Sequence, residues 1–194
     1  MKDNDSEERI LDATMQVVSR YTISGTRMRL IAEEADITQS VIHYYFKSKD
    51  NLMSCLQQRT SEHCFEYRRD IRDQYKPDSL QEQIDIFIRQ KLHFITDEQA
   101  CDFVEMDCWM QTRVNPAMKE SMSNAFHRWR EEVRTNIIDR FAPAMPEHDK
   151  CELCYTVISL LQGASLQYHL DEFDLDGYFD YCKEIIVRII NKYS

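Results

Sequence analysis

The scarcity of residues that interrupt helices is the feature that most restricts the fold of this chain. Its 194 residues include only 3 glycines and 4 prolines, whereas a sheet protein of this length uses more of both at its turns. Apolar residues recur instead at helical spacing, beginning with Ile10, Ala13, Val17, Val18 and Tyr21. We therefore expect an all-α fold of about nine helices.

Capping signals divide the chain into these helices. Ser6, Thr26, Thr38, Ser48 and Asn115 stand where a helix can begin, and the pairs Ser79–Glu82 and Thr96–Gln99 have the spacing of a capping box. The expected helices cover residues 7–21, 27–34, 39–46, 49–74, 80–95, 97–114, 116–141, 147–170 and 176–191. The second and third of these expected helices are much shorter than the helices that follow them.

The charge distribution limits the kinds of partner. The net charge is −10, which excludes a protein that coats nucleic acid or anionic lipid over its whole surface. Residues 1–52 hold 7 Lys and Arg against 9 Asp and Glu, a net charge of −2, so the remainder carries −8. A small local reader of DNA stays compatible with this balance, but the charge itself does not favour one.

Targeting and redox signals indicate a cytoplasmic protein. Residues 1–9 are polar and charged, and no later stretch has the length and apolarity of a membrane span. We therefore expect no signal peptide and no membrane partner. The 7 cysteines are odd in number and fall within helical patterns, so we interpret them as reduced thiols that are mostly buried.

The segment from Thr26 to Phe46 has the pattern of a helix-turn-helix. Two short helices flank the three-residue turn Ala35-Asp36-Ile37. We expect the inward residues to be Ile31, Ala32, Ile37, Ile42 and Phe46. In such a motif the second helix enters the major groove of DNA. Its outward side chains would then be Gln39, Ser40, Val41 and His43, which present groups suited to base edges and thymine methyls.

The residues around this helix complete the expected DNA contact. Thr26, Arg27, Thr38, Tyr44, Tyr45, Lys47 and Lys49 are placed for phosphates, together with the N-termini of the second, third and fourth helices. Two alternatives remain open. Tyr44, Tyr45 and Phe46 can also serve only as core, and Arg29 fits either a phosphate contact or a solvated helix face.

Residues 9–53 resemble the DNA-binding head of TetR-type repressors. The matching residues are Thr26, Ile31-Ala32-Glu33-Glu34-Ala35, Ile37-Thr38, Tyr45-Phe46-Lys47-Ser48-Lys49-Asp50 and Leu52. The resemblance covers about a quarter of the chain. It implies a homodimer that binds a palindromic operator on double-stranded DNA and releases it when a small-molecule effector binds the helical core.

Three positions depart from the family pattern. Thr22 and Asp36 stand where the family usually has glycine, and His43 replaces a tyrosine of the recognition helix. Aspartate tolerates a left-handed backbone better than most residues. Because His43 is not a tyrosine, the phosphate or base contact of the family tyrosine is not carried over to it directly. A histidine can still donate a hydrogen bond, either to a base or to a phosphate.

The remaining residues, 53–194, are expected to form an antiparallel helical bundle that binds the effector and dimerises, behind the DNA-binding domain of residues 1–52. The resemblance implies that the helices near 147–170 and 176–191 pair with their copies in a dimer. Their apolar residues also fit a role only in the monomer core. Those residues are Val157, Ile158, Leu160, Leu161, Ile185, Ile186, Ile189 and Ile190, with Gly163 as a point of close approach.

Aromatic and other candidate residues for an effector pocket are spread over this bundle, because such pockets are mostly apolar. They are Phe65, Phe103, Met106, Trp109, Met110, Phe126, Trp129, Tyr155, Gln162 and Tyr168. Glu105 and Asp107 beside Trp109 suit a cationic ligand. The same three residues are more readily explained as two solvated acids and one core residue.

Catalytic and metal signals are weak. No Ser/His/Asp arrangement, phosphate loop or carboxylate pair stands out, so we do not expect an enzyme or a cofactor. His148-x-x-Cys151-x-x-Cys154 has metal-ligand spacing but lacks a fourth ligand, and His63 is a single histidine on a helix. We expect no metal. The alternative function is a helical ligand-binding or interaction protein that does not bind DNA specifically.

Overall fold

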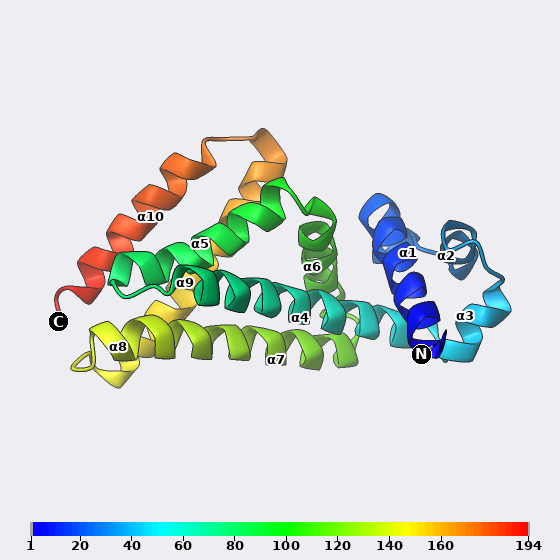
Figure 1. Ribbon diagram of the computed structural model, residues 1–194, viewed down its shortest axis with the longest axis horizontal. Coiled ribbons are helices and arrows are strands. Elements are labelled where there is room, and N and C mark those ends of the chain that lie inside the picture. Colours follow the sequence, from blue (N-terminus) through cyan, green and yellow to red (C-terminus); the bar gives the residue numbers. More distant parts are fainter. Residues whose placement is uncertain (1, 194) are drawn as a thin grey trace. The chain divides into compact units, whose positions relative to one another are not determined.

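The computed structural model describes residues 2–193, with side chains from residue 5 onward. Helices account for nearly all of this range, and no strand occurs within it. The helices are α1 (Lys2–Gly25), α2 (Met28–Glu34), α3 (Gln39–Tyr45), α4 (Lys49–Tyr75), α5 (Leu80–Thr96), α6 (Gln99–Gln111), α7 (Pro116–Val133), the π-helix η1 (Arg134–Ile138), α8 (Asp139–Phe141), α9 (Glu147–Asp171) and α10 (Leu175–Ile190) (Figure 1). Because α7, η1 and α8 follow one another without a break, the described residues hold nine helical segments, as expected.

Three helix boundaries follow the capping chemistry read from the sequence. Ser79 and Glu82 form the predicted capping box at the start of α5. Ser48 accepts a hydrogen bond from the backbone N–H of Asn51 at 3.1 Å at the start of α4. Asn115 caps α7 in the same way by accepting from the N–H of Met118 at 3.1 Å. Each of these side chains satisfies an N–H group that the helix itself leaves without a partner.

Three expected caps are wrong. Helix α1 begins at Lys2, so Ser6 lies inside it. The residue that precedes α2 is Arg27 rather than Thr26. Thr96 belongs to the last turn of α5, where its hydroxyl donates to the carbonyl of Leu92, and α6 starts after Glu98. Helix α1 therefore starts earlier than predicted, α2 starts one residue later, and α5 extends through the residue that was expected to cap α6.

The helices form two compact units. The first unit comprises residues up to 64 and residues 98–124, and the second comprises residues 65–97 and those from 125 onward. The long helices α4 and α7 contribute to both units. No helix among residues 2–193 is long and apolar enough to cross a membrane.

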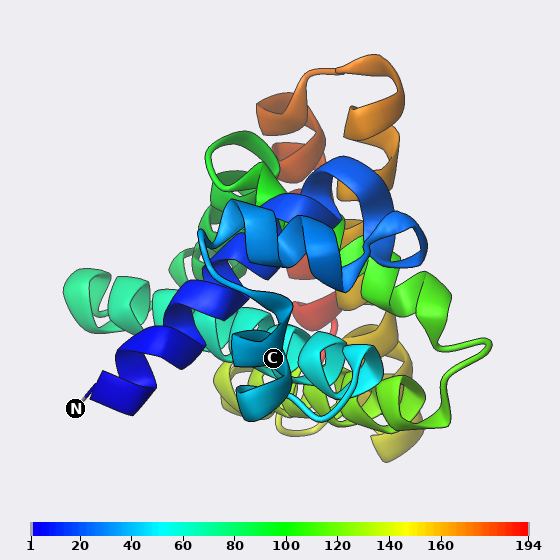
Figure 2. The same ribbon diagram turned by 90° about the vertical axis from the view of Figure 1, so that its right-hand side faces the viewer.

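The first unit is built around the short helices. Helix α1 packs against α2 and α6, and α2 packs against α3 (Figure 2). Ile10, Ile31, Ile42, Phe46 and Leu52 are fully buried there. The predicted inward face of α2 and α3 is therefore confirmed, except that Ile37 is only half-buried. Tyr21, which was expected on the inward stripe of α1, is exposed and lies next to the break that interrupts the helix at Thr22.

The second unit buries the apolar faces of α5, η1, α9 and α10. Helix α10 lies alongside α5, and α9 contacts both (Figure 1). Its core includes Phe87, Ile137, Val157, Phe179 and Ile186. Each of these fully buried side chains contributes roughly 1.5–3 kcal/mol through its removal from water. The core therefore comes mainly from segments that the apolar spacing identified.

Candidate nucleic-acid interface

The turn between α2 and α3 has the geometry of a helix-turn-helix. The N–H of Ile37 donates to the carbonyl of Ala32 at 3.0 Å, and Val41 begins α3 by donating to Thr38 at 3.0 Å. Asp36 has a φ of 50°, the left-handed region that favours glycine. The chain reverses direction at this residue, and α3 starts three residues later.

Helix α3 presents one face to solvent and one to the core. Gln39, Ser40, Val41 and His43 are exposed, whereas Ile42 between them is fully buried. The four exposed residues are those that the spacing predicted for base contacts. Buried Ile42 and Phe46 fix the rotation of α3, because turning the helix would expose both apolar side chains.

Two tyrosines at the end of α3 differ in their surroundings. Tyr44 is 77% exposed, and Tyr45 is half-buried. Their rings meet edge to face with centroids 5.0 Å apart. The interpretation of both residues as core is therefore wrong for Tyr44. Lys47 and Ser48, which follow α3, are exposed as well.

Lys49 and Thr26 form a contact that the sequence did not predict. Thr26 is 2% exposed, and its hydroxyl donates to the carbonyl of Thr22 at 2.7 Å. The ammonium of Lys49 donates to the carbonyl of Thr26 at 2.6 Å. Burial lowers the pKa of Lys49 below its ordinary value. Lys49 therefore joins the start of α4 to the backbone just before α2.

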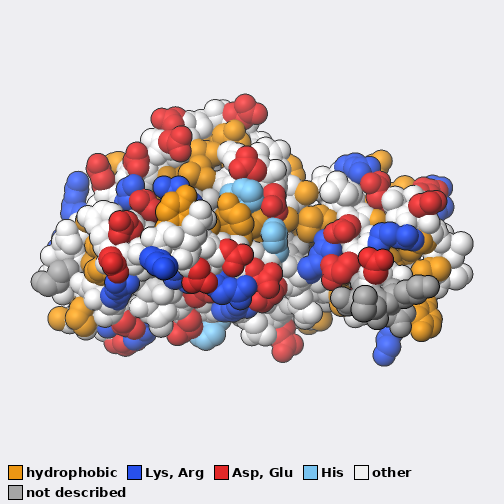
Figure 3. Space-filling model, viewed as in Figure 1, with side chains coloured by type: hydrophobic (Ala, Val, Ile, Leu, Met, Phe, Trp, Pro, Cys, Tyr) orange, Lys and Arg blue, Asp and Glu red, His pale blue; other side chains and the backbone are white. Residues whose placement is uncertain are grey.

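The acidic residues of α2 are held in ion pairs. Glu34 receives two hydrogen bonds from Arg20 of α1, at 3.0 and 2.8 Å, and Glu33 pairs with Arg29 at 2.6 Å. Figure 3 shows basic and acidic side chains interspersed over the face of α1–α3 that it displays. The pairs reduce the repulsion that free carboxylates would exert on a nearby phosphate backbone. Arg29 accordingly fits the solvated helix face better than a phosphate contact.

Arg27, Thr38 and Lys47 complete the set of predicted contacts and are all exposed. Arg27 and Thr38 are the residues that precede α2 and α3, and neither makes a capping bond with its side chain. Their side chains are therefore not used to close the helix ends.

The candidate effector residues do not form one group. Phe65, Phe126 and Trp129 lie together in the second unit, where the rings of Phe126 and Trp129 are 5.8 Å apart. Trp109 and Met110 are 60% and 57% exposed, and Tyr155 is also exposed. Phe126 is half-buried, as are Phe103 and Met106 in the first unit and Gln162 and Tyr168 on α9.

A buried arginine organises the aromatic group of the second unit. The guanidinium of Arg68 lies 5.0 Å from the ring centroids of Phe65 and Phe87 and 5.5 Å from that of Trp129. It donates to Glu132 at 2.8 Å and to Gln90 at 2.7 Å. These contacts compensate the charge of a side chain that is almost completely removed from water. The buried position of Arg68 was not predictable from the sequence, because its partners lie on three different helices.

Glu105, Asp107 and Trp109 do not converge on a cation site. Asp107 accepts a hydrogen bond from the backbone N–H of Ile23, just after the break in α1. Trp109 points to solvent. Glu105 instead lines a small cavity of the first unit. The three residues therefore serve separate places in the fold.

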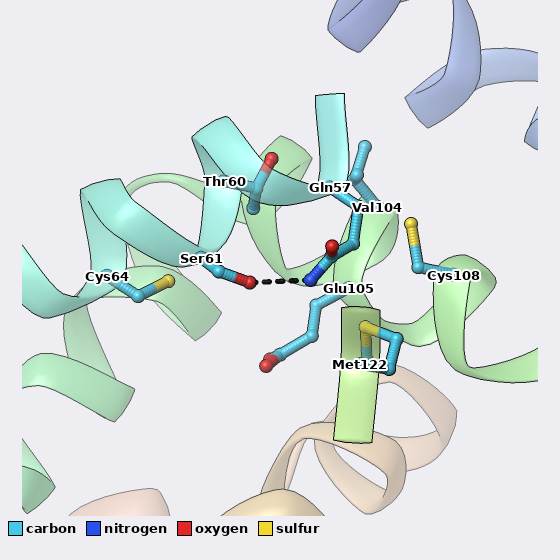
Figure 4. A pocket seen from close by; sticks show the side chains of 8 residues that line it. All are labelled: Gln57, Thr60, Ser61, Cys64, Val104, Glu105, Cys108 and Met122. Atoms are coloured by element: carbon cyan, nitrogen blue, oxygen red, sulfur yellow. Dashed lines mark hydrogen bonds between the residues drawn. The ribbon is translucent and has the colours of Figure 1, made fainter. Parts of the chain in front are cut away.

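This cavity lies between α4, α6 and α7 and has a volume of about 10 Å³ (Figure 4). Its lining residues are Gln57, Thr60, Ser61, Cys64, Val104, Glu105, Cys108 and Met122. Gln57 donates to Ser61 at 2.7 Å and accepts from Ser121. The volume holds about one water. The sequence analysis did not identify these residues, because they are not aromatic. The feature that could have indicated the cavity is the pair of buried polar residues Gln57 and Thr60 on α4.

Comparisons with known proteins agree with the geometry of α2 and α3. Residues 10–54 match the model of the family described as bacterial regulatory proteins, tetR family. An uncharacterized HTH-type transcriptional regulator, encoded in the dhlA 5' region of Xanthobacter autotrophicus, is 38% identical over 64 residues. This match covers 33% of the chain and 32% of the length of that relative.

Solved structures share the fold of the whole chain. A member of the TetR family from Streptomyces coelicolor A3 is 19% identical with a TM-score of 0.71, covering 94% of this chain and 96% of that one. FadR from Bacillus subtilis, in complex with stearoyl-CoA, is 13% identical with a TM-score of 0.80 and coverages of 93% and 97%. A protein from Saccharomonospora viridis in complex with choline is 19% identical with a TM-score of 0.80 and coverages of 94% and 96%. Residues 10–54 are therefore similar to the DNA-binding region of the TetR family, and the chain as a whole shares the fold of these solved structures.

Proposed function

We propose that this protein is a sequence-specific DNA-binding repressor that a small molecule releases from a palindromic operator. The exposed polar face of α3 carries the proposal. Gln39, Ser40 and His43 project from a short helix whose opposite side is fixed by buried Ile42. A helix of this kind fits the major groove, where side chains at its N-terminal end reach base edges. The protein would act in the cytoplasm, and nothing in its site chemistry calls for catalysis.

The contacts divide into two roles. Gln39, Ser40, Val41 and His43 would read bases. Arg27, Thr38, Tyr44 and Lys47 would hold phosphates, with Tyr45, Thr26 and Lys49 positioning the backbone beside them. Phosphate contacts fix the position of the protein on DNA, and base contacts supply the sequence preference. The functional division would then be a reader of residues 1–52 and a regulatory region of residues 53–194.

A homodimer would supply the second half of the operator contact. Tyr155, Leu166 and Leu170 are exposed along one stripe of α9, and a Cβ atom added at Gly163 on the same stripe would meet nothing within 4 Å. Tyr181 is exposed on α10. Five of the eight apolar residues expected at this interface are buried within the monomer. Dimerisation is therefore supported by the exposed stripe of α9 and not by those eight residues.

The cavity between α4, α6 and α7 suggests how an effector would act. Four of its lining residues belong to α4, the helix that directly follows α3. Because the cavity holds about one water, a larger molecule would have to displace α4. Such a shift in both protomers would change the separation of the two α3 helices, which must match half-sites about 34–36 Å apart.

Selection of duplexes from random DNA by the purified protein tests the DNA-binding proposal. We expect enrichment of an inverted repeat and a steep loss of affinity with salt. Absence of enrichment at low salt would contradict the proposal and favour the alternative, a helical ligand-binding protein without specific DNA binding. Crystals with and without an effector test the proposed movement. An unchanged separation of the α3 helices would contradict it.

A further inference from the structure

A cluster of three metal-binding residue types lies in the first unit, away from α2 and α3. His63 is on α4, Glu98 precedes α6, and Cys101 is in the first turn of α6. One ligand atom from each of these residues lies within 4.8 Å of the others. None of the three stood out in the sequence, because His63 is 35 residues from Glu98.

The distances inside the cluster suit a small cation. The Nε2 atom of His63 is 2.8 Å from Oε2 of Glu98, and Sγ of Cys101 is 3.7 Å from the same oxygen. In a tetrahedral zinc site with bonds of about 2.3 Å to sulfur and about 2.0 Å to oxygen, the sulfur and oxygen are about 3.5 Å apart. The nitrogen and oxygen would be about 3.3 Å apart. Coordination would therefore need only a small opening of the His63–Glu98 pair.

We propose that His63, Glu98 and Cys101 form a binding site for Zn²⁺. Thiolate, imidazole and carboxylate are the three ligand types that this ion takes in proteins. Harder cations such as Mg²⁺ and Ca²⁺ prefer sites made only of oxygen. A water molecule would take the fourth position, because His63 and Glu98 are partly open to solvent.

The surroundings favour coordination over a role in redox sensing. Cys101 is buried, and its Sγ lies beside the carboxylate of Glu98. A buried thiol is poorly accessible to oxidants, which react most readily with exposed thiolates. A metal ion binds the thiolate by displacing the thiol proton, which is released to solvent.

The site would connect three helices of the first unit. It joins α4 to the start of α6, and Sγ of Cys101 also lies 3.7 Å from the sulfur of Met15 on α1. This thioether gives Cu⁺ as the competing ion, since soft sulfur ligands select it. Co²⁺ distinguishes the two alternatives by its spectrum. A site for Zn²⁺ should also bind Co²⁺ as a substitute, whereas a site for Cu⁺ should not.

Titration of the purified full-length protein with Co²⁺ tests the proposal, in the presence of a phosphine reductant rather than a thiol. We expect one Co²⁺ per chain, a thiolate-to-cobalt charge-transfer band, and loss of this band when Zn²⁺ is added. His63→Gln and Cys101→Ser should abolish the band. Cys151→Ser and His148→Gln change an exposed cysteine and an exposed histidine outside the cluster and should leave it unchanged.

Two further measurements guard against misfolding. Circular dichroism without metal shows whether each variant keeps its helices. His63→Gln is the safer variant, because its side chain is 43% exposed. Zn²⁺ should also raise the Tm of the unmodified protein and not that of His63→Gln. No charge-transfer band, a band that persists in Cys101→Ser, or binding of Cu⁺ without Zn²⁺ would overturn the proposal.

Discussion

The ammonium of Lys49 donates a hydrogen bond to the backbone carbonyl of Thr26, 23 residues earlier in the chain, at 2.6 Å. This contact holds the first residue of α4 against the segment that leads into α2. The hydroxyl of Thr26 is turned inward, toward the carbonyl of Thr22. Lys49 therefore stabilises the entry to the helix-turn-helix, whether or not its charge also attracts a phosphate.

Substitution of Lys49 by Ala should weaken both the fold and DNA binding. We expect a loss of about 1 kcal/mol in the free energy of unfolding, since a partly exposed bond from a charged donor is worth somewhat less than a buried one. Affinity should fall for all duplexes alike, because α2 loses its support. Urea unfolding and salt-dependent DNA titration measure the two effects.

Lys47→Ala is the matched control for this prediction. Lys47 is exposed two residues before Lys49, so its loss should reduce DNA affinity and the salt slope without changing the free energy of unfolding. Equal stability of both variants would show that the bond from Lys49 to Thr26 contributes nothing to the fold.

Gln39→Ala should change the sequence preference rather than the overall affinity. Gln39 is the first residue of α3 and is exposed, and a glutamine that pairs with an adenine edge contributes about 1–3 kcal/mol of discrimination. Repeating the duplex selection with the variant should relax one symmetrical pair of positions in the operator. A uniform loss over all sequences, as expected for Lys47→Ala, would instead assign Gln39 to a phosphate.

Thr22→Gly should stabilise the protein. Thr22 has a φ of 59° and a ψ of 166°, a backbone region that is almost restricted to glycine and costs a β-branched residue about 1–3 kcal/mol. Glycine loses about 0.5–1 kcal/mol through its greater freedom in the unfolded chain, so we expect a net gain of about 1 kcal/mol. Thermal and urea unfolding measure the gain.

Gln16→Gly provides the comparison within the same helix. Gln16 is exposed in the regular part of α1, where glycine should cost about 1 kcal/mol. A loss of stability in both variants would mean that the conformation of Thr22 carries no strain.

The local parts of this structure were predictable from the sequence, because helical spacing and caps depend on neighbouring residues. The burial of Ile42 and the exposure of Gln39 follow from their places in one short helix. The positive φ of Asp36 was likewise suggested by its place in a turn where the family usually has glycine.

Contacts between distant helices were not predictable in this way. Residue type alone did not separate Trp129, which is buried, from Trp109, which is exposed. The grouping of His63 with Cys101 and the reach of Lys49 to Thr26 depend on how helices cross. A single sequence does not encode that crossing in any local pattern, so it does not show which of the candidate effector residues lie together in the fold.

The ion pairs of Asp139 predict a dependence of stability on pH. A hydrogen bond from Lys150, and another from Arg134, hold the pKa of Asp139 below its ordinary value. Since the pKa of the unfolded chain is about 3.9, this carboxylate stabilises the fold above that pH. The contribution is lost as the pH falls through the lower pKa of the folded state.

Asp139→Asn should therefore be less stable than the unmodified protein at neutral pH, and the difference should shrink below about pH 4. Urea unfolding over a range of pH measures it. In a Lys150→Met background the difference should be smaller at neutral pH, because the main partner is absent. A difference that is constant with pH would contradict the role of the charge.

Leu166→Arg should disrupt the proposed dimer. Leu166 lies on the exposed stripe of α9 that also contains Tyr155 and Leu170, so an arginine there would bury its charge in the contact between two protomers. Gln167→Arg adds the same charge at an exposed position beside the stripe and should leave the dimer intact. Analytical ultracentrifugation measures the mass of each variant. If only Leu166→Arg becomes monomeric, its affinity for a palindrome should also fall, because one protomer then contacts one half-site. If it stays dimeric, α9 does not form the interface through this stripe, and the two α3 helices must be paired through another surface.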